Sequence, residues 1–301
     1  MQANMKEFHE KRRNGIGGSD CAPALGLSKW KTPYSLYQEK RGEIEPQDET
    51  WEMGRGKALE PLLRQNYADT TGRKVIALHE AMRSDRHHFM TYSPDGLIVE
   101  EKRLVEFKTA AYGKEWGEVG SDEIPQEYLL QVQHGLIVTG YDVCDVTVSI
   151  AGNKPKYFVV EADRELQEMI IDREAVFWDM VQAGTPPDPI SNDDVAKIYR
   201  RVNGQSIVAN ADICSLLGDL RLVRDNIKNL EGEKESLEVT IKSFIGENEV
   251  LVAADGFTPL ATWKQQNGAK RIDADLLRSA YPQAAAECTK QGDPIRRFLL
   301  K

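Results

Sequence analysis

Closely spaced cysteines are missing from this sequence. Its four cysteines stand far apart and form no CxxC pair. Zinc ribbons and iron–sulfur clusters need thiolates at short, regular spacing, so the scatter argues against both. It suggests no disulfide framework either, which fits a protein that works in a reducing cytoplasm.

Long hydrophobic runs are lacking as well. A membrane-spanning helix needs about 20 predominantly apolar residues, and no stretch of this chain approaches that length. The first fifteen residues are charged rather than apolar, so they lack the core of a signal peptide. We therefore expect a cytoplasmic protein without a membrane partner.

An excess of basic residues, the usual mark of a nucleic-acid-binding protein, is also absent. The formal net charge is −9, whereas phosphate contacts are made by Lys and Arg. Locally the balance differs, because residues 1–41 hold more Lys and Arg than Asp and Glu. A site that gathers metal-binding carboxylates can be acidic and still offer a basic track, so charge neither supports nor excludes DNA.

A Pro-rich stretch, residues 185–189, divides the chain near residue 190. Before it, helical and strand-like segments alternate, which predicts an α/β domain over 1–190 with a mixed β-sheet flanked by helices. Strands are expected at 75–78, 89–99, 104–109, 143–150 and 156–160. Helices are expected around Leu59, Leu62, Leu63 and Tyr67, at 128–140, and at 163–183 with Met169, Ile170, Val176, Phe177, Met180 and Val181 inward.

After residue 190 the periodicity changes to a heptad. Apolar side chains occupy its two seam positions with one interruption at Lys234: Ile213, Leu216, Leu220, Val223, Ile227, Leu230, Leu237, Ile241 and Phe244. The repeat predicts a helical segment over 191–248, and a coiled coil and a long helix packed on its own domain remain equal interpretations. Residues 249–301 suggest a small α+β module with strands near 249–254 and 259–264.

The segment SPDGLIVEEKRLVEFKT, residues 93–109, carries the strongest chemical signal. Asp95 lies in a Pro-Asp-Gly turn, and Glu106 and Lys108 follow on one strand. Alternation places Glu106 and Lys108 on the same face, and a hairpin through EEKR would bring Asp95 beside Glu106. Two carboxylates can hold Mg²⁺ for phosphodiester cleavage, while a lysine orients the attacking water. The pattern alone is loose, because an exposed hairpin with a surface ion pair would look the same.

Four blocks in order narrow the interpretation. They are FHEKRRNGIGGSD (8–20), GRGKALE (54–60), SPDGL with EFK (93–108), and YLLQVQHGLIVTG (128–140). Together they resemble the YqaJ-type viral recombinase and phage lambda exonuclease family of the PD-(D/E)xK nuclease superfamily, over about residues 8–185. The resemblance implies a restriction-endonuclease-like core. It also implies a metal-dependent deoxyribonuclease that digests linear double-stranded DNA 5′→3′ during phage-type recombination.

By position, the resemblance implies two metal-binding carboxylates, a catalytic lysine, an acidic helix residue at a second metal or its water, and a glutamine beside the metal. The two carboxylates fall on Asp95 and Glu106, and the lysine falls on Lys108. The acidic helix residue falls on Glu60, and the glutamine falls on Gln131. The implied cofactor is Mg²⁺, with Mn²⁺ as a substitute. Glu60 also suits a first-turn glutamate favoured by the helix dipole, with Pro61 beside it at the helix start. Gln131 and Gln133 equally suit a buried hydrogen-bond network.

The opening block implies a pocket for the 5′-phosphate of a DNA end, formed by Arg12 and Ser19. Arginine binds phosphate through two N–H groups, and a helix N-terminus favours an anion. A solvated basic run is the other interpretation, and Arg13 could replace Arg12. The implied partners are double-stranded DNA ends, further copies of this chain in a trimer, and a single-strand annealing protein. The resemblance also implies that the protein is of phage origin and works in a bacterial host.

Two rival functions remain. An endonuclease or single-strand nuclease of the same fold would share the three catalytic residues, and only an end-reading enzyme needs the pocket of Arg12 and Ser19. A non-catalytic DNA-binding or scaffold protein would not need an intact catalytic set. Trp30, Trp51 and Trp116 could stack on bases, although tryptophan more often packs in a core.

Overall fold

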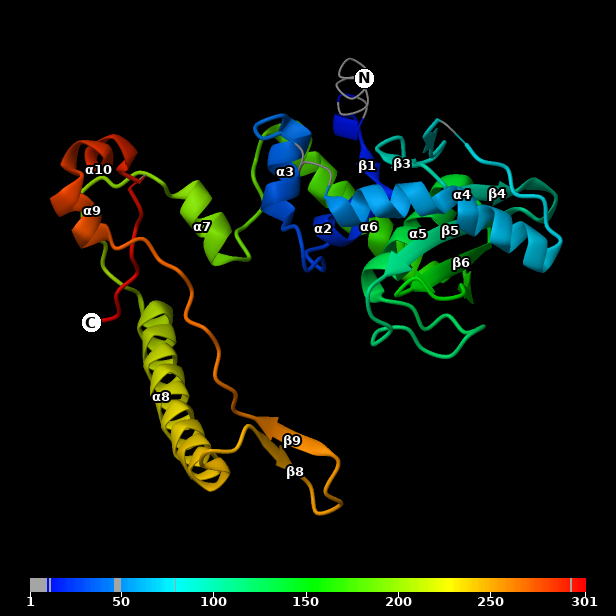
Figure 1. Cartoon of the computed structure of the whole chain (residues 1–301). Helices are drawn as coiled ribbons and strands as arrows, with labels where there is room; N and C mark the ends of the chain where they lie inside the picture. Colours follow the sequence, from blue (N-terminus) through cyan, green and yellow to red (C-terminus); the bar gives the residue numbers. More distant parts are fainter. Residues whose placement is uncertain (1–9, 11, 46–49, 79, 293) are drawn as a thin grey trace. The chain divides into compact units, whose positions relative to one another are not determined.

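The computed structural model describes residues 10, 12–45, 50–78, 80–292 and 294–301. Residues 8, 9 and 11 of the opening block therefore lie outside the described residues. The chain forms two compact units, Met1–Ile198 and Tyr199–Lys301, which are drawn in Figure 1 and described separately.

The first unit contains two β-sheets with helices around them (Figure 1). Its helices are η1 (Gly18–Asp20), α2 (Cys21–Ala24), α3 (Pro33–Arg41), α4 (Trp51–Thr71), η2 (Val99–Glu101), α5 (Gln126–Thr139), α6 (Arg164–Ala183) and α7 (Asn192–Ile198). Its strands are β1 (Ile16–Gly17), β2 (Met82–Arg83), β3 (Met90–Tyr92), β4 (Gly96–Ile98), β5 (Arg103–Ala110), β6 (Val143–Ile150) and β7 (Lys156–Glu161). Both sheets mix parallel and antiparallel pairs. The predicted α/β class with a mixed, helix-flanked sheet is confirmed.

The four-stranded sheet, ordered β4-β5-β6-β7, carries the hairpin that the sequence predicts. Strand β4 pairs antiparallel with β5, and Gly96 lies opposite Val105. Residue 95 therefore ends up beside residue 106 on the neighbouring strand. Strand β6 runs parallel to β5, and a parallel pair needs a crossover, which here includes α5.

The two faces of β5 pack against different helices. Val105 and Phe107 point toward α4, where they form a cluster with Leu63 and Tyr67. Leu104 points the other way, into the larger core that holds the apolar side of α5. Because side chains alternate along a strand, Glu106 and Lys108 lie on the α5 face.

Helix α4 begins earlier than the sequence suggested. The Thr50 hydroxyl accepts a hydrogen bond from the Met53 N–H and caps the helix at Trp51. Glu60 is therefore an interior residue, and the interpretation of Glu60 as a first-turn glutamate is wrong. Pro61 also lies inside the helix, where it can donate no backbone hydrogen bond. Leu62, whose spacing predicts the same helix face as Leu63 and Tyr67, is instead 63% exposed.

Helix α6 matches its predicted length but presents a different inner face. Its buried apolar residues, spaced seven and then four apart, are Ile170, Phe177 and Val181. Glu174 occupies the remaining inward position. Met169 and Val176, which were expected to face inward, are exposed, and Glu174 is buried instead.

Helix α7 follows the Pro-rich stretch and still belongs to the first unit. Asp194 is fully buried there. Its carboxylate accepts hydrogen bonds from the Thr32 hydroxyl at 2.7 Å and from the Ile190 N–H at 3.2 Å. These bonds tie the chain after the prolines back to the start of α3.

The second unit is built on a long helix, α8 (Ala211–Ile245), which Asn210 caps by accepting a hydrogen bond from the Ile213 N–H. Strands β8 (Val250–Val252) and β9 (Pro259–Thr262) form an antiparallel pair, and α9 (Ala274–Ala280) and α10 (Pro282–Cys288) follow. Among the described helices of both units, none has the length and apolar character that crossing a bilayer requires.

Candidate active site

Asp95 and Glu106 meet at the edge of the four-stranded sheet. The Asp95 carboxylate accepts a hydrogen bond from the backbone N–H of Phe107 at 2.8 Å, which fixes it against β5. Glu106 is fully buried on that strand. The hairpin thus brings the two carboxylates together, as the sequence predicts.

Lys108 and Gln131 complete a hydrogen-bonded cluster around Glu106. The Lys108 ammonium donates to Glu106 Oε2 at 2.5 Å and to Gln131 Oε1 at 3.2 Å. The Gln131 amide nitrogen donates to the same Glu106 oxygen at 3.2 Å. The Tyr128 ring lies 5.2 Å from the ammonium, close enough for a cation–π contact. The Lys108 ammonium is therefore positioned by three contacts, with Glu106, Gln131 and Tyr128.

Tyr92 also belongs to this cluster, although no motif in the sequence points to it. Its hydroxyl donates to Glu106 Oε1, the carboxylate oxygen that Lys108 does not use. Two glycines make room for its ring: a Cβ on Gly18 would lie 2.8 Å from ring atoms, and a Cβ on Gly135 only 2.4 Å. The run Met90–Tyr92 signals a buried strand, but its sequence does not show which carboxylate the hydroxyl meets.

The electrostatics of the cluster favour a bound cation. Burial and then the charge of Glu106 raise the pKa of Asp95 to about 8. Burial opposes the charged form of Lys108, but Glu106 and Asp95 outweigh it and raise the lysine pKa. The single ammonium of Lys108 thus faces the two buried carboxyl groups of Asp95 and Glu106. One positive charge is too little to balance both groups when they are ionised. Carboxylate oxygens are the ligands that hard divalent cations prefer, and Asp95 with Glu106 fits such an ion.

Glu60 reaches the rim of the cluster through a neighbour. It forms an ion pair with Arg64 one turn along α4, and Arg64 donates to the backbone oxygen of Asp95 at 3.0 Å. The charge of Glu60 contributes to the raised pKa of Asp95. Glu60 is therefore near Asp95 but bonded to Arg64.

Arg12 and Ser19 are brought together as predicted. Arg12 donates to the Ser19 hydroxyl oxygen and to Asp20 Oδ1, both at 3.1 Å. Asp20 and Lys40, which no sequence pattern singles out, support this pair: buried Lys40 donates to Asp20 Oδ2 at 2.6 Å and to the Arg12 carbonyl at 2.8 Å. Burial opposes the charge of Asp20, but Lys40 and Arg12 prevail and lower its pKa well below the usual range.

The two glutamines of α5 have different surroundings. Gln133 lies on the side away from the carboxylates and accepts hydrogen bonds from the Asp163 N–H at 3.1 Å and from Gln167 at 3.0 Å. It also donates to the Glu161 carbonyl at 2.7 Å. Gln133 thus belongs to a structural network, while Gln131 contacts the candidate site.

A second buried cluster joins α2, α5 and α6 behind the site. His134 Nε2 lies 2.9 Å from the Thr91 carbonyl, to which it donates, and His134 Nδ1 lies 2.8 Å from Glu174 Oε1. Cys21 offers its sulfur within 4.8 Å of these ligand atoms. Burial disfavours the imidazolium, but Glu174 outweighs it and raises the pKa of His134. The sequence offered one signal for this cluster, the heptad spacing of Glu174 with the inward residues of α6.

Comparison with known proteins identifies the family of this chain. The family model of the YqaJ-like viral recombinase domain matches residues 7–142. The uncharacterized protein YqaJ of Bacillus subtilis (strain 168) is 33% identical over 308 residues, covering 98% of this chain and 93% of its own length. The chain belongs to the YqaJ-like viral recombinase family.

Solved structures show the fold of this family member. A crystal structure of an alkaline exonuclease from Laribacter hongkongensis superposes with a TM-score of 0.51 at 22% identity. It covers 60% of this chain and 94% of the exonuclease chain. The shared α/β architecture is thus that of a known exonuclease.

Proposed function

We propose that this chain is a Mg²⁺-dependent DNA exonuclease that hydrolyses phosphodiester bonds from the 5′ ends of linear double-stranded DNA. The observation that carries the proposal is that one hairpin places the side chains of Asp95, Glu106 and Lys108 close together in a buried cluster. Family membership and the exonuclease fold support it. The core would then be of the PD-(D/E)xK type, and recombination of phage DNA in a bacterial cytoplasm is the setting that the family name suggests.

Each residue of the cluster has a distinct task in this mechanism. Asp95 and Glu106 would hold the ion, which when bound neutralises charge on the phosphate and activates water. Lys108, kept protonated by its carboxylate neighbours, orients that water and stabilises the developing negative charge. Gln131 and Tyr92 fix the Glu106 carboxylate, and such partners of a metal ligand tune the affinity for the ion.

Glu60 would act from the rim of the site. Its ion pair with Arg64 is only partly buried, so the carboxylate can exchange its partner at modest cost. Released from Arg64, Glu60 would reach a second ion or a metal-bound water. Mn²⁺ should replace Mg²⁺, because both accept hard oxygen ligands.

Recognition of the DNA end is assigned to Arg12 and Ser19. Both present hydrogen-bond donors at one place, and Asp20 with Lys40 holds the guanidinium there. A phosphate would accept bonds from both side chains, and charge-assisted bonds of this kind are strong. The pocket lies close to the proposed metal site, because Gly18, next to Ser19, packs so tightly that a Cβ there would lie 3.2 Å from Gln131. This pocket favours an end-reading exonuclease over an endonuclease of the same fold.

The second unit is assigned to assembly. The heptad side chains of α8 are substantially exposed, with Leu216, Leu237 and Phe244 among the most exposed. A stripe of this kind supports a coiled coil between chains. A homo-oligomer, expected to be a trimer, and a single-strand annealing protein are the partners proposed for it.

Digestion of linear duplex DNA tests the proposal. Substrates with a 5′-phosphate or a 5′-hydroxyl are compared with a closed circle, in Mg²⁺, Mn²⁺ and EDTA. We expect metal-dependent loss of one strand from phosphorylated ends, an intact circle, and at least about a 100-fold loss of turnover in Glu106→Gln. Cutting of the circle would make the enzyme an endonuclease, and full activity of folded Glu106→Gln would refute the mechanism.

A further inference from the structure

Three buried side chains with metal-binding atoms meet where α2, α5 and α6 pack together. They are Cys21, His134 and Glu174, and each is fully buried. The cysteine sulfur, a histidine nitrogen and a carboxylate oxygen all lie within 4.8 Å of one another. The proposed DNA chemistry uses none of them. They come from three helices that are distant in the sequence, so no short ligand spacing marks them.

The hydrogen bonds of His134 leave one of its nitrogens facing an acceptor. Nε2 lies 2.9 Å from the Thr91 carbonyl, and because a carbonyl oxygen only accepts, Nε2 carries the proton. Nδ1 then faces Glu174 Oε1 at 2.8 Å. A nitrogen lone pair and a carboxylate oxygen can lie this close only when a positive charge stands between them. That charge is either a proton or a metal ion.

A proton would satisfy only part of this cluster. It would join His134 Nδ1 to Glu174 Oε1, but the second carboxylate oxygen, Oε2, is buried without a hydrogen-bond partner in the part of the chain that the structure describes. A buried polar atom left in this way costs free energy. The Cys21 sulfur is the third neighbour, because burial and then the charge of Glu174 raise the pKa of its thiol. A metal ion can bind the sulfur, the nitrogen and the carboxylate together.

We propose that Cys21, His134 and Glu174 bind a structural transition-metal ion of the zinc class, separate from the proposed Mg²⁺ site. A thiolate and an imidazole suit Zn²⁺, whereas Mg²⁺ prefers oxygen ligands. Tetrahedral bonds of about 2.0–2.3 Å place the ligand atoms about 3.4–3.6 Å apart. The histidine–glutamate pair must therefore open from 2.8 Å by roughly half an ångström, which side-chain rotation can supply. Glu174 Oε2 is available as a fourth ligand.

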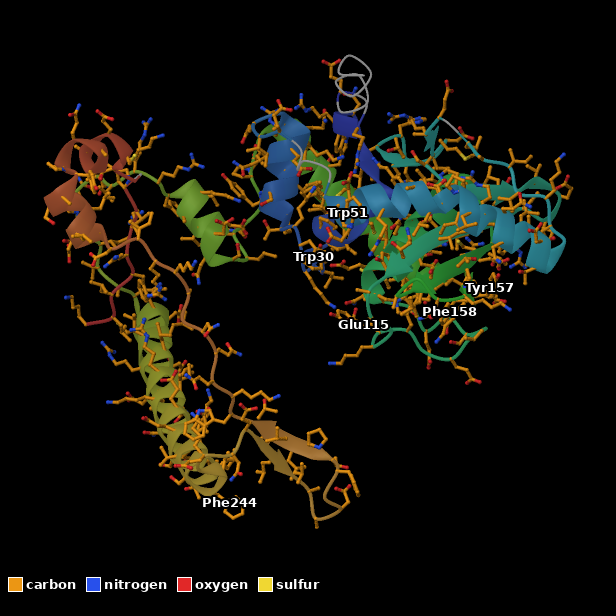
Figure 2. The ribbon with its side chains drawn as sticks, in the orientation of Figure 1. Trp30, Trp51, Glu115, Tyr157, Phe158 and Phe244 are labelled. Carbon is orange, nitrogen blue, oxygen red and sulfur yellow. The ribbon has the colours of Figure 1, made fainter. Side chains whose placement is uncertain are left out.

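The surroundings of the cluster suit a structural ion and not a catalytic one. Cys21 belongs to the large apolar core of the first unit, together with Ile170 and Phe158, which is labelled in Figure 2. Structural zinc sites are closed in this way, whereas catalytic ones keep a position for water or substrate. Cys21 also directly follows Asp20, which holds Arg12 of the proposed phosphate pocket. The ion would thus fasten that pocket to α5 and α6. The inference stands independently of the proposed nuclease function.

Cobalt binding by the full chain tests the proposal. Co²⁺ accepts the ligands of Zn²⁺, and a cobalt–thiolate bond gives a charge-transfer band in the near ultraviolet. The oxygen ligands of the proposed active site give no such band. The two exposed cysteines are first replaced by Cys214→Ser and Cys288→Ser, which yields a parent chain with only buried thiols. In this parent chain Cys21→Ala is compared with Cys144→Ala, which removes the other buried thiol and is the matched control.

We expect the thiolate band in the parent chain and in Cys144→Ala, and its loss in Cys21→Ala. The affinity for Zn²⁺, measured by competition with a colorimetric chelator, should fall in Cys21→Ala by more than the about 10- to 100-fold that follows loss of a residue supporting a ligand. Glu174→Gln is a second variant that can keep the fold, because its amide can donate to His134 Nδ1. It should also weaken Zn²⁺ binding at least about tenfold.

Thermal unfolding adds a readout that does not depend on a thiolate band. Zn²⁺ should raise the unfolding midpoint of the EDTA-treated parent chain and of Cys144→Ala, and it should leave that of Cys21→Ala nearly unchanged, because an ion bound only to the folded state stabilises it. A cobalt–thiolate band that persists in Cys21→Ala would overturn the proposal. Its absence from the parent chain, together with an unfolding midpoint that Zn²⁺ does not raise, would also overturn it. The cluster would then be a histidine–glutamate pair joined by a proton.

Discussion

The Tyr92 hydroxyl donates a hydrogen bond to Glu106 Oε1 while Lys108 binds Oε2 of the same carboxylate. The two oxygens of the buried metal-binding candidate are thus each fixed by a different element. Burial and the charge of Glu106 raise the pKa of Tyr92 well above its usual value. The Tyr92 hydroxyl therefore stays a neutral hydrogen-bond donor from acidic to mildly alkaline pH.

Replacing Tyr92 by phenylalanine should weaken metal binding more than it weakens the fold. The variant keeps the ring between Gly18 and Gly135 but removes the bond that orients Glu106. We expect the Mg²⁺ concentration for half-maximal activity to rise about 10- to 100-fold, as is usual when a partner of a metal ligand is lost. Tyr67→Phe is the control, because its hydroxyl bonds buried Asp145 and none of the proposed catalytic residues. The same Mg²⁺ requirement in Tyr92→Phe and wild type would contradict the assigned role.

Replacing Arg12 by alanine should reduce the preference for phosphorylated ends. The variant removes the guanidinium that Asp20 holds beside Ser19. Hydrogen bonds to charged groups contribute about 1.5–3 kcal/mol, so the KM for a 5′-phosphorylated duplex should rise about tenfold or more. The KM for a 5′-hydroxyl duplex should change little. Arg13→Ala serves as the control, because Arg13 forms an ion pair with Glu45 instead, and an unchanged phosphate preference in Arg12→Ala would discard the pocket.

The sequence predicted those parts of the site that depend on local pattern. Strand β6 spans the predicted residues 143–150, because its run of apolar and β-branched residues is long and bounded. The convergence of Asp95 and Glu106 follows from a short hairpin, in which pairing register is a local property. For the same reason the shared face of Glu106 and Lys108 could be read from alternation alone.

The remaining parts depend on contacts between distant segments. Tyr92, Asp20 and Lys40 gained their partners only through packing of β3, η1 and α3, and no spacing rule connects these residues. Proline usually marks the start of a helix, but Pro61 lies inside α4, because the Thr50 cap and the burial of the Leu63 side hold the helix together across it. Gln131 and Gln133 are the same residue type on one helix, and their roles differ only because their side chains face different sides of that helix.

Removing the Glu174 carboxylate should destabilise the first unit strongly. Glu174 is buried and accepts from His134, so Glu174→Ala leaves a buried imidazole without its partner. Breaking a buried pair from one side costs about 3–5 kcal/mol. Glu168→Ala, on the exposed side of the same helix, should change stability by less than about 0.5 kcal/mol. Urea unfolding followed by circular dichroism measures both, and equal midpoints would show that the buried cluster contributes nothing.

Neutralising Asp95 should abolish cleavage yet stabilise the metal-free protein at high pH. The pKa of Asp95 is about 8 in the folded chain against 3.8 in the unfolded one. Between these values the folded state holds a proton that the unfolded state has lost, so stability falls as pH rises from about 4 to 8. Asp95→Asn carries no charge to deprotonate, and its amide oxygen can still accept the Phe107 N–H.

Thermal unfolding in EDTA at pH 5, 7 and 9 therefore separates the two proteins. The wild type and Asp95→Asn should have similar midpoints at pH 5, and the variant should be the more stable at pH 9. Each 1 kcal/mol of difference moves the midpoint by about 2–4 °C for a domain of this size. Adding Mg²⁺ at pH 9 should raise the wild-type midpoint and leave that of the variant nearly unchanged, because binding to the folded state alone stabilises it. If the unfolding midpoints of the two proteins changed with pH in parallel, the pKa of Asp95 would not be raised by its burial beside Glu106.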